Sequence, residues 1–142
     1  MTKPFLAALA LVLAAGTAEA EPLTVTDAWI RALPGGLPAA GYFTLHNATA
    51  KTVVLTGAGA ADCAEFMLHR SDTSNGMAMM EDTTAIPVPP GKGIAFAPGG
   101  YHLMCLTPSA RVKAGGHIPV TLYFAGGARL ETVFAVRGAT GR

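Results

Sequence analysis

Turn-forming residues divide most of this chain into short segments. Beyond the first twenty residues, Gly, Pro and Asn recur at short intervals, and no stretch between them sustains apolar residues at helical spacing. The segments are either apolar or alternate between apolar and polar residues, a pattern typical of strands joined by turns. The 17 glycines and 10 prolines of the sequence suit many turns. We therefore expect an all-β fold.

The segments predict eight or nine short strands, which favours an antiparallel sandwich or barrel. Residues 86–93 are rich in Pro, which cannot donate to a ladder, so they are expected at an edge or in a loop. Trp29 is expected to fill the core. The other predicted strands cover residues 23–30, 40–47, 52–56, 64–70, 77–82, 94–97, 101–106, 118–124 and 130–136.

The first twenty residues have the pattern of a secretory signal peptide. Lys3 precedes an apolar run at residues 5–15, and Ala18-Glu19-Ala20 forms a small-residue cleavage site. The apolar run is too short for a membrane span, which needs about 20 apolar residues. No later segment is long and apolar enough either. We expect cleavage after Ala20, so that residues 21–142 form one mature domain.

Charge is sparse and evenly spread. Charged residues make up 13% of the chain, the formal net charge is +1, and no basic or acidic run occurs. This argues against nucleic acid or an anionic membrane as a partner. We expect an exported monomer. Export to an oxidising compartment permits a disulfide between the two cysteines, Cys63 and Cys105, but does not require one.

Four side chains between residues 69 and 104 are candidate metal ligands: His69, Met80, His102 and Met104. On a strand, His102 and Met104 point to the same face because they are two residues apart. The other two donors flank a polar turn. A four-residue turn would place His69 directly opposite Met80, whereas a two-residue turn would place Ser71 there and His69 one diagonal step away. Either turn leaves both donors on one face.

Two imidazoles and two thioethers make a soft, uncharged ligand set that suits Cu(I). Zinc prefers thiolate or more imidazole, and hard cations prefer carboxylates. A blue-copper centre, which needs Cys and two His, is disfavoured by the order of residues 102–105. Methionine on a strand is more often simply core, and short motifs are weak evidence.

Two other interpretations stay open at this stage. The Met77, Met79 and Met80 cluster would equally suit a protein interface in an adhesion or interaction protein. A redox role for Cys105 is less favoured because the chain has no Cys-x-x-Cys motif. We find no constellation of catalytic residues, and therefore expect a binding protein, not an enzyme.

The spacing His-x10-Met-x21-His-x-Met, met by His69, Met80, His102 and Met104, resembles that of the periplasmic copper chaperones of the PCu(A)C family. Residues 28–31 (AWIR), 40–47 (AGYFTLHN) and 98–104 (PGGYHLM) extend the likeness across nearly the whole mature chain.

The resemblance implies a cupredoxin-like, Greek-key β-barrel that binds Cu(I) through those four side chains in the periplasm. It further implies delivery of copper towards the CuA centre or other copper sites of cytochrome c oxidase. The expected partners are therefore an oxidase subunit or a thioredoxin-like Sco carrier.

Overall fold

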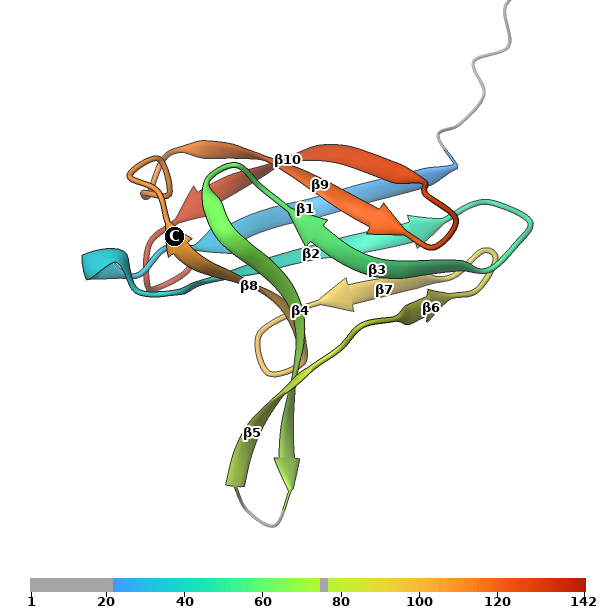
Figure 1. Cartoon of the computed structure of the whole chain (residues 1–142), viewed down its shortest axis with the longest axis horizontal. Helices are drawn as coiled ribbons and strands as arrows, with labels where there is room; N and C mark the ends of the chain where they lie inside the picture. The colour runs from blue at the N-terminus through green and yellow to red at the C-terminus, as the bar shows by residue number, and fades with distance from the viewer. Residues whose placement is uncertain (1–21, 75–76) are drawn as a thin grey trace, which may run out of the picture.

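The computed structural model describes residues 22–74 and 77–142, which form one ten-stranded sheet with a single short 3-10 turn at Pro34–Gly36 (Figure 1). The predicted signal peptide and the tip of the predicted turn at Asn75-Gly76 lie outside the described residues. The strands are β1 (Leu23–Arg31), β2 (Ala39–Asn47), β3 (Val53–Gly59), β4 (Cys63–Ser74), β5 (Met77–Asp82), β6 (Ile86–Val88), β7 (Gly93–Phe96), β8 (Tyr101–Pro108), β9 (His117–Phe124) and β10 (Arg129–Arg137).

The sheet curls on itself, as Figure 1 shows, with hydrogen-bonded neighbours in the order β5-β4-β8-β2-β1-β10-β9-β3-β6, while β7 also pairs with β2. Every pairing among the described strands is antiparallel except β1 with β10, which is parallel. The all-β fold class is confirmed. None of the described residues belongs to a helix long and apolar enough to cross a membrane.

The core is one cluster of side chains from the inward faces of the strands. Phe43 lies at its centre, with ring centroids 4.4 Å from Phe96 and 5.8 Å from Phe134. Leu103 and Cys105 of β8 are completely buried in the cluster. The alternate residues of β8 therefore point to the other face, which is the face that carries His102 and Met104.

A bulge in β1 contradicts the expectation that Trp29 fills the core. The register with β2 shifts between Thr26 and Trp29, and Asp27 has a positive φ of 53°. The extra residue turns Ile30 fully inward and Trp29 outward. The indole instead packs on Tyr42, with ring centroids 4.8 Å apart.

A disulfide between Cys63 and Cys105 ties β4 to β8 on the core side of the sheet. Its two cysteines are 42 residues apart in sequence. Cys105 directly follows Met104, so the crosslink fixes the pair of strands that carries three of the four candidate ligands. Neither cysteine is free.

The far half of β4 and all of β5 form a two-stranded ribbon that extends from the body of the barrel (Figure 1). Two-stranded ribbons twist more strongly than wide sheets. Met80 lies on this ribbon and is 64% exposed. Among the described strands, the next one, β6, pairs only with β3, and it includes Pro87, as expected for a Pro-containing edge strand.

Candidate metal centre

The ladder between β4 and β8 places two histidines and two methionines in adjacent cross-strand pairs. His69 lies directly opposite His102, and Met67 lies directly opposite Met104. Residues opposite each other, or two apart on one strand, share a face of the sheet. The four side chains therefore occupy neighbouring positions on the outer face, opposite the disulfide and core.

A tight turn before β8 aims the His102 ring. Pro98 and Gly99 occupy the centre of the turn, Gly99 has a φ of 86°, and the Gly100 amide donates to the Ala97 carbonyl. Pro followed by a residue with positive φ is the signature of a type II turn. The Gly100 carbonyl then accepts from the Ser71 amide at 3.0 Å and lies 3.3 Å from His102 Nδ1.

His102 presents an unused nitrogen in a buried position. A carbonyl oxygen can only accept, so the contact with Gly100 requires the proton on Nδ1 and leaves the lone pair on Nε2. Nε2 is buried and has no hydrogen-bond partner, and the residue is only 4% exposed. A backbone carbonyl that fixes the tautomer in this way is typical of metal-binding histidines.

The environment keeps the His102 ring neutral. Burial lowers the pKa of His102 from its usual 6.5, the Gly100 carbonyl opposes this shift, and the charge of a protonated His69 adds to it. Because a metal ion binds only the unprotonated nitrogen, a lowered pKa favours metal binding over proton binding.

The His69 ring lies close to that of His102, with centroids 5.5 Å apart and an interplanar angle of 81°. Neither ring nitrogen of His69 makes a hydrogen bond, although both are buried. Nε2 does lie 2.9 Å from the Asp82 carboxylate, a close charge contact without hydrogen-bond geometry. The described part of the protein thus offers no hydrogen bond to His69 Nδ1 or His102 Nε2, whereas His69 Nε2 has the Asp82 carboxylate beside it.

Met80 stands apart from the other three predicted ligands. It lies opposite Ser71, which places it on the same ribbon face as His69 but one diagonal step away. This is the register of a two-residue connection, one of the two alternatives that the sequence left open. Met80 and Met104 lie on opposite sides of His69, about 16 Å apart at the backbone in a flat sheet, given spacings of about 4.8 Å between strands and about 3.3 Å per residue.

Asp82 is a neighbour that the sequence analysis missed. The same register that puts Ser71 opposite Met80 puts His69 opposite Asp82. A pattern of His and Met spacings does not reveal this carboxylate, but counting from a two-residue turn would have done so. Its side chain is 80% exposed.

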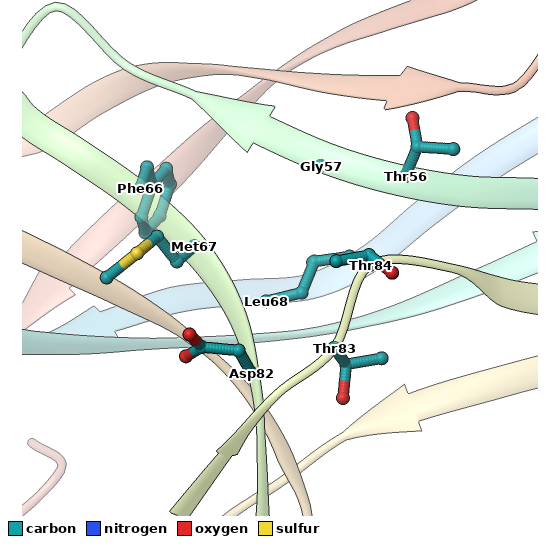
Figure 2. A pocket seen from close by; sticks show the side chains of 8 residues that line it. All are labelled: Thr56, Gly57, Phe66, Met67, Leu68, Asp82, Thr83 and Thr84. Carbon is teal, nitrogen blue, oxygen red and sulfur yellow. The ribbon is translucent and has the colours of Figure 1, made fainter.

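A hollow beside the ladder contains neither histidine. It is lined by Phe66, Met67, Leu68 and Asp82, together with residues of β3 and of the segment after β5. Figure 2 shows that the Met67 and Asp82 side chains extend from β4 and β5 to one side, whereas Leu68 extends to the other. The hollow therefore adjoins the outer face at Met67 but is not the metal centre itself.

The donor set present fits a soft metal ion. Within residues 22–74 and 77–142, no three His, Cys, Asp or Glu side chains gather closely enough to hold a metal. The two imidazole nitrogens would thus need thioethers to complete a coordination sphere, and thioethers select Cu(I) over zinc and hard cations.

Comparisons with known proteins agree with the fold. Residues 23–136 match the family model described as "Putative lipoprotein LpqE-like". A protein of Leifsonia xyli subsp. xyli (strain CTCB07), named "Putative lipoprotein Lxx21020", is 30% identical over 124 residues, which cover 87% of this chain and 74% of that protein.

Two solved structures are also similar. The copper-bound PCuAC domain from PmoF2 has a TM-score of 0.67 and 25% identity, with 85% of this chain and 97% of that chain covered. The solution structure of Cu(I)-DR1885 from Deinococcus radiodurans has a TM-score of 0.67 and 28% identity, with coverage of 84% and 81%. The resemblance to the PCu(A)C family that the sequence indicated is confirmed.

Proposed function

Because the chain belongs to the LpqE-like family and has the fold of PCu(A)C domains, we propose that it is an exported copper chaperone that binds Cu(I) and passes it to another protein. The observation that carries the proposal is the pairing of His69 with His102, each of which has a buried ring nitrogen without a hydrogen bond, on a face of the sheet that also carries thioethers. Two relatives of this fold contain copper.

The proposed ligands are His69, Met80, His102 and Met104. The β4/β8 ladder supports the placement of three of them, and the twist of the β4–β5 ribbon would have to bring Met80 over His69 for all four to bind one ion. Thioethers bind Cu(I) without losing a proton, so the site needs no thiolate. A site without thiolate suits an ion that is to be transferred to an acceptor by ligand exchange.

Copper would leave by ligand exchange at the exposed end of the site. Met80 is mostly exposed, whereas His102 is buried, so an incoming donor reaches Met80 first. In this account the protein is a carrier and catalyses no reaction. Following the family resemblance, we propose that the acceptor is the CuA domain of a cytochrome c oxidase subunit or a Sco-like carrier in the periplasm.

A competition titration with a coloured Cu(I) chelator tests the binding. We expect His102→Asn to lower Cu(I) affinity by at least about tenfold, because even the loss of a residue that only orients a metal ligand costs about 10- to 100-fold in metal affinity. His117→Asn is the matched control, since His117 is exposed at the start of β9 and far from β4 in the sheet order. Equal affinity of both variants and the unaltered protein would contradict the proposal.

Exposed methionines on the ribbon favour one alternative. Met77 is 67% exposed, Met79 is 50% exposed, and both lie on the ribbon that extends from the barrel. Such side chains suit an interaction protein that needs no metal. In that case Met79→Ser would impair binding to a partner protein, while His102→Asn would have no effect on function.

A further inference from the structure

We infer that Met67 is a copper ligand, and that Met67, His69, His102 and Met104 form a site that can hold Cu(I) without Met80. This inference rests on the proposed copper binding and adds to it a thioether that lies outside the His-x10-Met-x21-His-x-Met spacing. It also assigns different roles to the methionines: Met67 and Met104 retain the ion, and Met80 takes part in its transfer.

The position of Met67 carries the inference. It lies directly opposite Met104 and two residues before His69 on the same strand, so it shares the outer face with both. Side chains directly opposite in an antiparallel pair have Cβ atoms about 4.5–5.5 Å apart. Two flexible thioethers at that separation can both reach one ion beside the histidine pair.

Met80 is placed much less favourably. It lies on β5 opposite Ser71, on the side of His69 that faces away from Met104. In a flat sheet the backbones of Met80 and Met104 would be about 16 Å apart. The two side chains therefore meet at one ion only if the ribbon twists over the site. Met67 needs no such movement because the β4/β8 ladder already holds it in place.

Packing does not account for Met67. Neither Met67 nor Met104 is among the side chains that make up the hydrophobic core or pack against it. Both are partly buried on the outer face, where they flank the two imidazoles. Figure 2 shows the Met67 thioether directed away from Leu68, which packs in the core. A partly covered thioether beside unsatisfied ring nitrogens is suited to a soft ion.

The arrangement gives copper transfer an order. When Met80 leaves the ion, Met67 takes its coordination position, and Cu(I) keeps two sulfur and two nitrogen neighbours until a donor of the acceptor displaces one of them. No atom is oxidised or reduced in this exchange, since one thioether replaces another. The ion therefore stays bound while the exposed ribbon is free to engage the acceptor.

The test compares Met67→Leu, Met80→Leu and the double variant, loaded with Cu(I) alone. We expect X-ray absorption to count two sulfur neighbours in each single variant and one in the double variant. We expect competition titration to show a further loss of at least about tenfold in affinity from Met80→Leu to the double variant. Met79→Leu is the control, because Met79 is exposed on the opposite face of the ribbon from Met80.

One sulfur neighbour in Met80→Leu, with a double variant that binds Cu(I) no more weakly than Met80→Leu, would overturn the role of Met67. The proposed site of His69, Met80, His102 and Met104 would remain intact. Failure of the unaltered protein to bind Cu(I) would instead refute the proposed function, and this inference with it. Leucine has nearly the volume of methionine, and a thermal unfolding curve for each variant confirms that it is folded.

Discussion

At the scale of single residues, the chemistry depends on how His102 is held. Its Nδ1 proton points to the Gly100 carbonyl, and its Nε2 lone pair is buried without a partner. An unpaired buried polar atom costs free energy, so this ring is stabilised poorly in the copper-free protein. Copper binding would satisfy it, which gives the ion a favourable interaction that a fully hydrogen-bonded ring could not offer.

The lowered pKa of His102 predicts how acid affects stability. The folded protein keeps the ring neutral at a pH where the unfolded chain, with a pKa of 6.5, is already protonated. The unfolded state then binds more protons, so stability falls as pH drops below 6.5 towards the folded pKa. We expect the unfolding temperature of the copper-free protein to fall over that range, and to fall less in His102→Asn. An equal fall in both would contradict this account.

The same pKa shift predicts the pH range of copper binding. Because protonation of His102 is disfavoured, its Nε2 should remain available for Cu(I) below pH 6.5 and be lost only in stronger acid. A Cu(I) competition titration from pH 7.5 downwards should show affinity that declines in acid. Affinity that stays constant throughout would argue against histidine ligation.

Asp82 is predicted to be a neighbour of the ion and not a ligand. Its carboxylate is 80% exposed beside His69 Nε2, and exposed charge contacts contribute about 0–1 kcal/mol. We therefore expect Asp82→Asn to change Cu(I) affinity by less than about fivefold, whereas His69→Asn should lower it by at least about tenfold. A loss in Asp82→Asn as large as that in His69→Asn would make the carboxylate a ligand.

At the scale of elements, the β4/β8 pair is the scaffold of the site. Parity along β8 was sufficient to predict that His102 and Met104 share a face away from the core, and the buried Leu103 and Cys105 agree with this. Parity could not predict which strand pairs with β8, because cross-strand register depends on the whole fold. The pairing of Met67 with Met104 was therefore visible only in the structure.

Other features depended on contacts between distant parts of the chain. The bulge that turns Trp29 outward breaks the alternation on which its core position was predicted. The sequence permitted the Cys63–Cys105 disulfide but could not establish it, since its cysteines are 42 residues apart. Turn residues, by contrast, act locally, and the Pro98-Gly99-Gly100 turn falls between the predicted strands 94–97 and 101–106.

Removing the disulfide should destabilise the fold and loosen the ladder that holds the site. For a closed loop of this length, the chain-entropy model gives a loss of about 4 kcal/mol for Cys63→Ala with Cys105→Ala. Urea unfolding of the copper-free double variant measures the loss. A change below about 1 kcal/mol would show that the crosslink adds little to the native strand pairing.

At the scale of the whole molecule, a disulfide-linked barrel supports an exposed ribbon. The disulfide, the core and the buried His102 belong to the barrel, whereas Met77, Met79 and Met80 lie on the ribbon (Figure 1). In the proposed function the barrel would retain the ion, and the ribbon would present the first ligand to the acceptor.

Export is a property of the whole chain that can be tested directly. The small-residue site at Ala18-Glu19-Ala20 predicts that the exported protein begins at Glu21. The intact mass of protein recovered from the periplasmic fraction should match residues 21–142, less two hydrogen atoms for the disulfide. A mass that includes the first twenty residues would contradict cleavage.

The most direct measurement of the central claim is X-ray absorption on the unaltered protein loaded with one equivalent of Cu(I). The account predicts a single copper environment with two imidazole nitrogens and two thioether sulfurs as nearest neighbours. A spectrum with no sulfur neighbour, or with no imidazole, would contradict it.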